Sequence, residues 1–510
     1  MKFVLITYDG HGLPIAYRLL KEGYDVLVGQ AKELEHMPKE DEETKRRRLS
    51  LYDGMLEKMD ADELVNKLEK ETKKDDYFIF CDFNYVYPYA ERLKKAGFKG
   101  LLPNEEDFKL EEDRNYAKEL VRRNYDIFSE QEVIEFDSVE EAREFLKDTD
   151  KLWGVKGNNP ESPTYFPASN DINIAQEDLI EILENNKKLY ESGGFILEEK
   201  IEDLIEFVPE IIVNQGEILG LNINIELKPF GAGNTAWQTG DSASMIMWLK
   251  EEDWEKIIPL FFPESMKNYY LRENEMVVWD AGVMYSPSRD KFYFSEFCSD
   301  REGWSSVFNK LSTFAFVGDY FERIANKEKL FTEDVFPYGC SIRVFNEIKE
   351  TKKGLEKFVK SDQRFFANLD NPNVWLWDVK MKNEKLYTVG YDHNLAVITQ
   401  AGADWKICFQ LIDKLLTEGK EFFYGLSYWR RDFDIINESY WGNIKQRFNF
   451  VMQNILSKEI KDEVLIKKQH LVFENRMQRL KENLGKKIKI SEATIKDLER
   501  LIEFYLQKNE

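Results

Sequence analysis

A chain of 510 residues is too long for a single hydrophobic core and is expected to form several subdomains. Its 95 acidic residues outnumber its 72 basic ones, and the net charge of −23 excludes general binding to nucleic acid or anionic membranes. Four cysteines without a CxxC pair and four histidines without metal-pair spacing argue against a disulfide framework and a zinc hydrolase. No apolar run approaches the roughly 20 residues of a membrane span, so a cytoplasmic location without a membrane partner is expected.

The chain begins with an apolar run and a glycine turn. Residues 2–7 predict a strand, the turn contains Asp9–Gly12, and Pro14 opens a helix that leads to a second strand at Asp25–Val28. In such a βαβ start, backbone N–H groups and the helix N-terminus could receive a phosphate. A plain tight turn is the alternative, because two glycines without a third are common.

Two segments in the middle of the chain place charged residues at strand ends. Trp153–Lys156 is predicted to be a short strand ending in lysine, and in Gly194–Phe207 an apolar strand meets Glu198 and Glu199. The backbone edge of such a strand can hydrogen-bond an adenine, while a carboxylate accepts ribose hydroxyls. The alternatives are an ordinary solvated lysine and glutamates that cover a sheet edge.

The next segments predict secondary structure but show no pattern typical of a particular reaction. Pro229–Ser244 is a run of small and polar residues and predicts a long loop, which is usually functional or mobile. Residues 335–435 return to short strands with a helix at Ala403–Leu416, and the chain from Ile436 predicts helices rich in lysine and glutamate.

The stretch Phe292–Asp300 places a carboxylate in an aromatic strand. Alternation puts Glu296, Cys298 and Asp300 on one face together with two phenylalanines. A carboxylate there must be paired, solvated or bound to a cation. Mg²⁺ on nucleotide phosphates takes one or two carboxylates, so this strand predicts a metal site. An edge strand with a wet polar face is the alternative.

Taken in chain order, these segments resemble the ATP-grasp superfamily and, within it, the phosphoribosylamine–glycine ligases. The resemblance covers about residues 1–435, and its specificity comes from the colinear order of short matches. The matches are Asp113–Lys118, Gly154–Lys156, Leu197–Ile201, Gly231–Thr235, Gly282–Tyr285 leading into Ser295–Phe297, Leu395–Thr399, Ala403–Leu416 and Phe422–Phe433.

The resemblance implies an α/β fold of ATP-grasp architecture. It implies an N-terminal Rossmann-like (pre-ATP-grasp) domain at 1–105, an ATP-grasp domain at 106–334, a small mixed α/β C-terminal domain at 335–435 and a helical extension at 436–510. It further implies an ADP-forming carbon–nitrogen ligase of purine synthesis, which joins small-molecule amine and carboxylate substrates through an acyl phosphate. ATP and Mg²⁺, with Mn²⁺ as the alternative ion, are the implied cofactors. It leaves the oligomeric state open.

The resemblance also assigns roles to single residues. Arg301 is the implied catalytic residue, which steadies developing charge. The implied nucleotide contacts are Arg114, Lys156, Glu198, Glu199, Lys200, Ile201 and Glu206. The implied substrate contacts are Gly10, His11, Gly12, Asn234, Thr235, Arg430 and Arg431, of which the last two have a surface salt-bridge or cation–π cluster as their alternative. The implied metal ligands are Glu296, Cys298 and Asp300, with Asp280 as an additional candidate.

The sequence departs from the family pattern at several of these positions. Arg114 stands where a phosphate-directed lysine is usual, and Cys298 stands where the family has asparagine. Because a thiol is a poor Mg²⁺ ligand, the metal site is altered. The loop Gly157–Tyr165 contains two prolines, the N-terminal turn is only partly kept, and Arg301 lies one residue beyond the family's arginine. Two alternatives therefore stay open: an ATP-grasp ligase with another amine or acid, and a nucleotide-binding protein without ligase activity.

Overall fold

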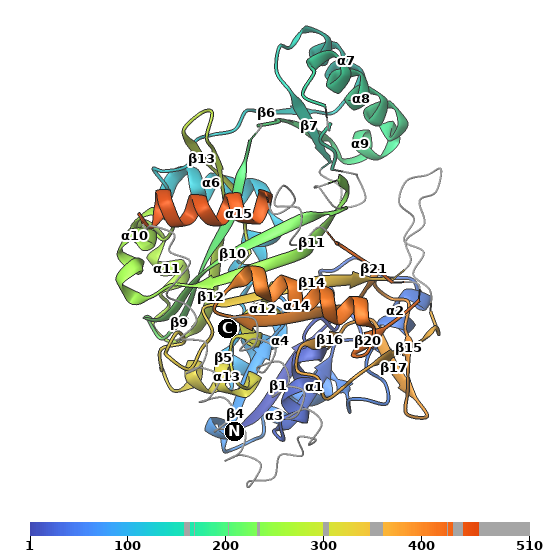
Figure 1. Ribbon diagram of the computed structural model, residues 1–510, viewed down its shortest axis with the longest axis vertical. Coiled ribbons are helices and arrows are strands. Elements are labelled where there is room, and N and C mark those ends of the chain that lie inside the picture. Colours follow the sequence, from blue (N-terminus) through green and yellow to red (C-terminus); the bar gives the residue numbers. More distant parts are fainter. Residues whose placement is uncertain are drawn as a thin grey trace, which may run out of the picture. The chain divides into compact units, whose positions relative to one another are not determined.

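The computed structural model describes residues 1–157, 164–167, 169–201, 203–231, 235–298, 305–346, 361–425, 427–431 and 442–457 (Figure 1). These residues form two compact units. Unit 1 comprises Met1–Glu119, Phe207–Gly282 and the described residues from Glu296 onward, and unit 2 comprises Leu120–Glu206 and Val283–Ser295. The four contiguous domain ranges expected from the sequence stay a prediction.

A 14-stranded sheet has most of its residues in unit 1, whereas most of β13 is assigned to unit 2. Its strand order is β16-β19-β14-β11-β10-β9-β12-β5-β4-β1-β2-β3, with β13 paired to β12 and β21 paired to β14. In chain order the strands are β1 (Lys2–Thr7), β2 (Asp25–Gln30), β3 (Met59–Asp60), β4 (Tyr77–Cys81), β5 (Gly100–Leu101), β9 (Ile205–Asn214), β10 (Glu217–Gly231), β11 (Thr235–Trp248), β12 (Met276–Ser286), β13 (Lys291–Phe297), β14 (Tyr338–Phe345), β16 (Val374–Leu376), β19 (Asn394–Gly402) and β21 (Tyr428–Trp429).

The N-terminal end of this sheet is parallel and has the strand order 3-2-1-4-5 of a Rossmann-like fold. Five of the six residues of β1 are buried, as expected for a strand covered on both faces. The helices that follow these strands are α1 (Leu13–Lys21), α2 (Glu42–Leu49), α3 (Ala61–Leu68), α4 (Tyr87–Lys95) and α5 (Glu105–Glu112). The Rossmann-like N-terminal fold expected from the sequence is confirmed.

The other end of the sheet is antiparallel, and its longest pair corrects one prediction. The segment Pro229–Ser244, predicted to be a loop, lies mostly in the paired strands β10 and β11. Its small polar residues are buried against backbone: the Ser242 hydroxyl donates to the carbonyl oxygens of Leu227 and Pro229 at 2.6 and 2.7 Å. The proline sits where the register shifts, which is where a sheet accepts one.

Two helices cover opposite faces of β14, as neighbouring side chains show. Cys340 donates its thiol to the Trp405 carbonyl oxygen at the start of α14 (Trp405–Glu418). Ser341, which follows it, faces the other way and lies 3.0 Å from the hydroxyl of Ser244, to which Asn309 of α12 (Ser305–Ser312) donates at 2.7 Å. Successive side chains of a strand point to opposite faces, so the sheet is a layer between α12 and α14.

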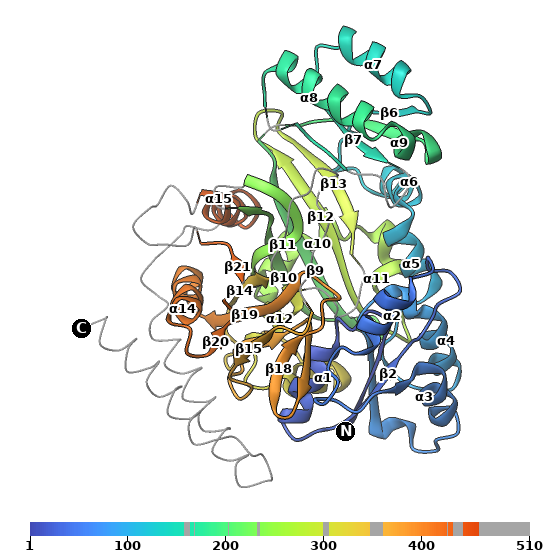
Figure 2. The same ribbon diagram turned by 90° about the vertical axis from the view of Figure 1, so that its right-hand side faces the viewer.

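Unit 2 has its own small sheet and core. Three strands, in the order β6-β8-β7, carry helices on one side, as Figure 2 shows. Val155 and Leu197 of the sheet pack with Leu146, Leu179 and Tyr190 of the helices in one cluster. The elements are β6 (Val133–Phe136), β7 (Trp153–Gly157), β8 (Phe195–Glu199), α7 (Val139–Asp148), α8 (Ile172–Asn185) and α9 (Lys187–Gly193).

The remaining elements complete the described chain. A four-stranded sheet has the order β17-β18-β15-β20. Its strands are β15 (Arg364–Ala367), β17 (Val379–Lys382), β18 (Lys385–Thr388) and β20 (Phe422–Phe423), and the other helices are α6 (Arg114–Asn124), α10 (Glu251–Phe261), α11 (Lys267–Tyr270), α13 (Val317–Ala325) and α15 (Gly442–Phe450). Of the predicted extension at 436–510, the structure describes 442–457. Within the described residues, no helix has both the length and the apolar character needed to cross a membrane.

Candidate functional site

The strands β7 and β8 bring Lys156 next to Glu198 in unit 2. Gly154 lies opposite Glu198 in the antiparallel register, and Nζ of Lys156 is 2.7 Å from Oε1 of Glu198. The Glu198 side chain is only 5% exposed, so this contact is a desolvated, charge-assisted hydrogen bond. The lysine ammonium also lies 5.5 Å from the centre of the Phe166 ring. Two residues predicted to contact nucleotide therefore form one pair.

Glu199 and Lys200, the next residues of this hinge segment, have other partners. Arg289 donates to Oε1 of Glu199 at 3.0 Å, and Nζ of Lys151 lies 3.7 Å from the same oxygen. Lys200 donates to the carbonyl oxygen of Pro167 at 2.7 Å. The hinge side chains are thus anchored by neighbouring strands and loops, and strand β8 itself ends at Glu199.

Asp280 lies near three glutamates from three other strands, whose charges act on it. Glu210 of β9, Glu226 of β10, Asp280 of β12 and Glu296 of β13 form this acidic cluster. Burial raises the pKa of Asp280 well above its usual range, and the charges of the three glutamates raise it further. The backbone N–H of Cys298 donates to Oδ1 of Asp280 at 2.9 Å, which partly offsets these effects. A divalent cation would relieve such repulsion.

Two lysines neutralise part of the acidic cluster. Buried Lys310 lies 3.1 and 3.2 Å from the two oxygens of Glu210. Lys228 lies 3.5 Å from Oε1 of Glu296, whose side chain is 52% exposed. Glu296 is therefore an accessible member, and Glu210 is already satisfied. Among the residues that the structure describes, no three His, Cys, Asp or Glu side chains are grouped so as to hold a metal ion by themselves.

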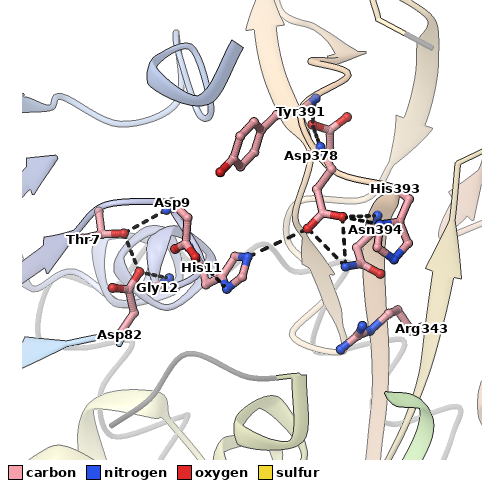
Figure 3. A network of polar contacts seen from close by, with 12 residues as sticks. Thr7, Asp9, His11, Gly12, Asp82, Arg343, Asp378, Tyr391, His393 and Asn394 are labelled. Carbon is pink, nitrogen blue, oxygen red and sulfur yellow. Dashed lines mark hydrogen bonds and ion pairs between the residues drawn. The ribbon is translucent and has the colours of Figure 1, made fainter. Parts of the chain in front are cut away.

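The glycine turn after β1 lies where the strand order reverses between β1 and β4, the usual place of a ligand in this fold. Its backbone N–H groups are occupied by the protein itself. Gly10 donates to Oγ1 of Thr7 at 2.9 Å, His11 donates to Oδ1 of Asp9 at 3.2 Å, and Gly12 donates to Oδ2 of Asp82 at 2.8 Å (Figure 3). The next amide, that of residue 13, donates to the carbonyl oxygen of Gly10 at 3.1 Å. No N–H group from 10 to 13 is left for a phosphate.

The two glycines are required by packing. A Cβ atom at Gly10, whose φ is +87°, would lie 2.8 Å from Cδ1 of Leu51. A Cβ atom at Gly12 would lie 2.7 Å from Cδ1 of Leu5 and 3.0 Å from Cβ of Asp82. The turn is thus closed by the protein's own side chains.

His11 projects from this turn between two carboxylates. Its Nδ1 lies 3.3 Å from Oδ2 of Asp9, and its Nε2 lies 3.8 Å from Oδ2 of Asp392. The rings of Phe83 and Trp377 lie against it, with centroids 4.9 and 4.7 Å from the imidazole. Burial acts to lower the pKa of His11, but the two carboxylates outweigh it and raise that pKa above its usual value.

A second histidine and an amide fix Asp392 from the other side. Nδ1 of His393 lies 2.7 Å from one carboxylate oxygen, and Nδ2 of Asn394 donates to both oxygens at 3.2 Å. Burial acts to raise the pKa of Asp392, but His393 and His11 hold it well below its usual range. The turn that contains Asp392 is held by Asp378, which accepts the backbone N–H groups of Gly390, Tyr391 and Asp392 at 2.7, 2.9 and 3.3 Å. We call Asp9, His11, Asp392, His393 and Asn394 the polar network.

The polar network continues to the hairpin of β10 and β11. The ring of His393 stacks on Phe345 at 5.7 Å, and Phe345 in turn contacts Phe230 near the end of β10 at 5.1 Å. Buried Arg430 donates to the carbonyl oxygen of Pro229 at 3.2 Å. A chain of ring contacts therefore runs from the polar network to β10, where Arg430 also binds, and the predicted substrate contact Asn234 lies outside the described residues.

Other predicted site residues lie apart or outside the described residues. The Arg431 side chain is exposed, and its guanidinium lies 5.6 Å from the centre of the Trp429 ring. Ile201 is buried, Glu206 is on β9, and Thr235 begins β11. Arg114 begins α6, and its side chain is outside the description, as are Asn234, Asp300 and Arg301. The sequence prediction of the site omitted Asp392 and His393, whose only indication was a polar turn between two short strands.

No family model and no curated protein sequence matches the chain, but solved structures do. It is similar to phosphoribosylamine–glycine ligase from Thermotoga maritima, with a TM-score of 0.57 and 15% identity over 85% of this chain and 100% of that chain. It is also similar to biotin carboxylase from Campylobacter jejuni, with a TM-score of 0.51 and 12% identity over 83% of this chain and 91% of that chain. A third similar structure is the biotin carboxylase domain of 2-oxoglutarate carboxylase from Hydrogenobacter thermophilus. Its TM-score is 0.50, with 15% identity over 81% of this chain and 89% of that chain. This chain has an ATP-grasp fold.

The ATP-grasp fold confirms the resemblance and the fold class expected from the sequence. At identities of 12–15% the likeness establishes the architecture, and the chemistry has to be argued from the side chains. In this ATP-grasp protein those side chains are the hinge pair of unit 2, and the acidic cluster and the polar network of unit 1.

Proposed function

We propose that this protein is an ATP-dependent ligase that joins a small-molecule carboxylate to an amine through an acyl phosphate. The observation that carries the proposal is the desolvated Lys156–Glu198 pair at the strand hinge of an ATP-grasp fold. Phosphoryl transfer asks the protein for positioning and charge neutralisation, which a fixed cation beside a strand edge supplies. In support, the similar domain from Hydrogenobacter thermophilus was solved in complex with MgADP and bicarbonate.

The hinge residues have separate tasks in this proposal. The backbone of Lys200 and Ile201 meets the adenine, and Glu199 or Glu206 accepts the ribose hydroxyls. Lys156 binds the phosphates, with Arg114 as a second cation. Glu198 holds the Lys156 ammonium in place, since the two groups are 2.7 Å apart.

The acidic cluster fits Mg²⁺, with Mn²⁺ as the alternative ion. Asp280 and Glu296 would hold it, because this ion takes one or two carboxylates together with phosphate oxygens and Asp280 already suffers like-charge repulsion. Cys298 contributes its backbone N–H to Asp280, and its thiol is a poor ligand for this ion. Asp300 stays an additional candidate. When bound, the ion neutralises charge on the transferred phosphoryl group.

The reaction proceeds in two substitutions. A carboxylate oxygen of the acid attacks the terminal phosphorus of ATP, and the bond to the ADP oxygen breaks with its electron pair. The amine nitrogen then attacks the acyl carbon, the C–N bond forms, phosphate leaves with the C–O electron pair, and the nitrogen releases a proton. Arg301 is proposed to stabilise the developing charge.

The substrates are proposed on two different grounds. The resemblance favours phosphoribosylamine and glycine, as in purine synthesis in the cytoplasm, with Gly10, His11, Gly12, Asn234, Thr235, Arg430 and Arg431 facing the acceptor. A ligase for another amine is the second candidate, and the occupied amides of the glycine turn favour it. ADP release from ATP separates these two candidates. Release that requires both phosphoribosylamine and glycine supports the first candidate, and no release with this pair of substrates favours a ligase for another amine.

Substitution of the hinge lysine tests the nucleotide site. Lys156→Met removes the cation beside the phosphates, so its affinity for Mg-ATP should fall about tenfold or more, measured by isothermal titration. Lys147→Met is the matched control, because Lys147 is 51% exposed and pairs with Glu144 on α7. Equal affinity in Lys156→Met and in the unaltered protein, or no ATP binding in either, would contradict the proposal.

A further inference from the structure

Resting on the ligase function proposed above, we propose that the acceptor substrate is a small cationic amine without a phosphate group, bound by Asp9 and Asp392 beside His11. This assignment departs from phosphoribosylamine, which carries a phosphate. It follows from the glycine turn, where the protein's own Thr7, Asp9 and Asp82 take three N–H groups. The anion-binding property of such a turn is therefore already used within the fold.

Two buried hydrogen-bond acceptors near the polar network have no donor among the described residues, whereas Nδ1 of His11 and of His393 lie 3.3 and 2.7 Å from carboxylate oxygens. Asp82 is fully buried, and no donor among the described residues reaches its Oδ1. Asn394 is 4% exposed, and its Oδ1 likewise has no donor among those residues. Buried polar atoms are normally paired, so two buried acceptors without donors call for a ligand rich in N–H groups. A primary ammonium brings three such donors and a phosphate brings acceptors.

The charge around the polar network also favours a cation. Asp9 and Asp392 are the carboxylates that face the two nitrogens of His11, and Asp392 is held ionised. Burial raises the pKa of Asp82 and of Asp378 to about 7, so these two groups add less negative charge. The guanidinium of Arg48, which lies against Tyr8 at the same turn, donates to the backbone carbonyl oxygens of residues 8, 31 and 32 and pairs with Glu40. That cation therefore serves the fold. Arg343, a second guanidinium near the network, donates to the carbonyl oxygen of Thr239 at 3.1 Å and lies 5.9 Å from the centre of the Trp377 ring. A phosphate beside His11 would meet the carboxylates of Asp9 and Asp392.

The geometry leaves the network reachable and gives it apolar walls. The side chains of Asp9, His11, Asp392 and His393 are each between 14% and 16% exposed, so one edge of each meets solvent. The rings of Phe83 and Trp377 beside His11 would contact the carbon skeleton of the amine or its charge. The occupant is therefore a compact amine and not a large polymer.

Binding measured without ATP tests the assignment. Thermal unfolding is followed with ethanolamine or 1,4-diaminobutane and, separately, with ribose 5-phosphate or inorganic phosphate, each at about 5 mM. At least one amine should raise the melting temperature and both phosphates should leave it unchanged. Asp392→Asn should weaken amine binding about tenfold or more, whereas Asp370→Asn, which alters an exposed ion pair with Lys21, should not.

Two further arms separate the possible failures. Because Asp392→Asn can disturb its turn, Asp9→Asn is tested in parallel, and a loss of amine binding in both folded variants supports the site. Stabilisation by ribose 5-phosphate, amine binding that survives in both variants, or no amine binding in the unaltered protein overturns it. Mg-ATP is added to a separate sample. If the ligase proposal fails, Mg-ATP does not raise the melting temperature of that sample, while amine binding is still measured in the others.

Discussion

Glu22 shows how a single carboxyl group sets a pH dependence. Its two oxygens accept the backbone N–H groups of Val317 and Gly318 at 2.8 and 3.0 Å, which caps the start of α13. Burial raises the pKa of Glu22 to about 7 despite these two hydrogen bonds and the nearby Arg18, which lower it. The folded protein therefore holds a proton on this group at a pH where the unfolded chain has lost it.

The expected result is a loss of stability as pH rises. A carboxyl whose folded pKa exceeds its unfolded value of 4.5 stabilises the fold fully below pH 4.5 and loses that contribution as pH rises to about 7. Between pH 5 and pH 8, the free energy of unfolding of the unaltered protein should fall by at least about 1 kcal/mol more than that of Glu22→Gln. Urea titrations measure this difference. The exposed Glu57→Gln should behave like the unaltered protein, and parallel pH curves for Glu22→Gln would refute the assignment.

Single residues also show what a sequence can and cannot reveal about a site. Glu296 was predicted as a metal ligand because a charged residue interrupts an aromatic strand, and it lies on the half-exposed face that alternation requires. The role of Asp392 was not predicted. Its importance comes from His11, which lies far away in the chain, and a pairing across that separation leaves no pattern in either segment.

Strand β7 carries the hinge lysine, and one of its glycines is fixed by a neighbouring ring. A Cβ atom at Gly154 would lie 2.2 Å from Cδ1 of Phe166, so the ring must move if any side chain is added. Phe166 is the ring that lies against the ammonium of Lys156. Packing of β7 and the geometry of the hinge are therefore linked through this one contact.

Gly154→Ala should destabilise the protein through overpacking. A cost of about 1–3 kcal/mol in the free energy of unfolding is expected, because a tightly packed neighbour has to leave its rotamer. Chemical denaturation followed by circular dichroism measures it. Gly425→Ala is the control, since no atom of the described residues lies within 4 Å of the Cβ position there, and it should change stability by less than about 0.5 kcal/mol. Equal stability of the two variants would contradict the packing argument.

The elements differ in how far their sequence predicts them. Strands β1 and β4 are continuous apolar runs buried on both faces, and such runs are recognised without knowing their neighbours. The hairpin around Pro229–Ser244 was predicted to be a loop, because small polar residues usually mark loops. In the structure, the Ser244 hydroxyl of this hairpin contacts Asp241 and Ser341 and accepts a hydrogen bond from Asn309 of α12. Ser341 and Asn309 lie far away in the chain, so the local sequence does not reveal them.

Among the described residues, each of the two units has a cluster of buried side chains of its own. Unit 2 has its own cluster of buried side chains, with Leu179 and Leu197 among them. In the Rossmann-like part of unit 1, Leu64 and Val65 of α3 belong to a different cluster with residues of β1 and β4. Each unit is built from stretches that are not contiguous, so neither can be excised as a single piece of sequence.

Separate cores predict separate responses to core mutations. Leu179→Ala removes a side chain that is 1% exposed and should cost about 2–5 kcal/mol, all of it within unit 2. Amide hydrogen exchange followed by mass spectrometry should then rise in β6, β7 and β8 while β1 and β4 keep their protection. Leu64→Ala, the matched change in unit 1, should give the reverse pattern. Loss of protection in both units from either substitution would mean that the protein unfolds as one cooperative block, because a cavity confined to one core raises exchange elsewhere only when the two cores open together.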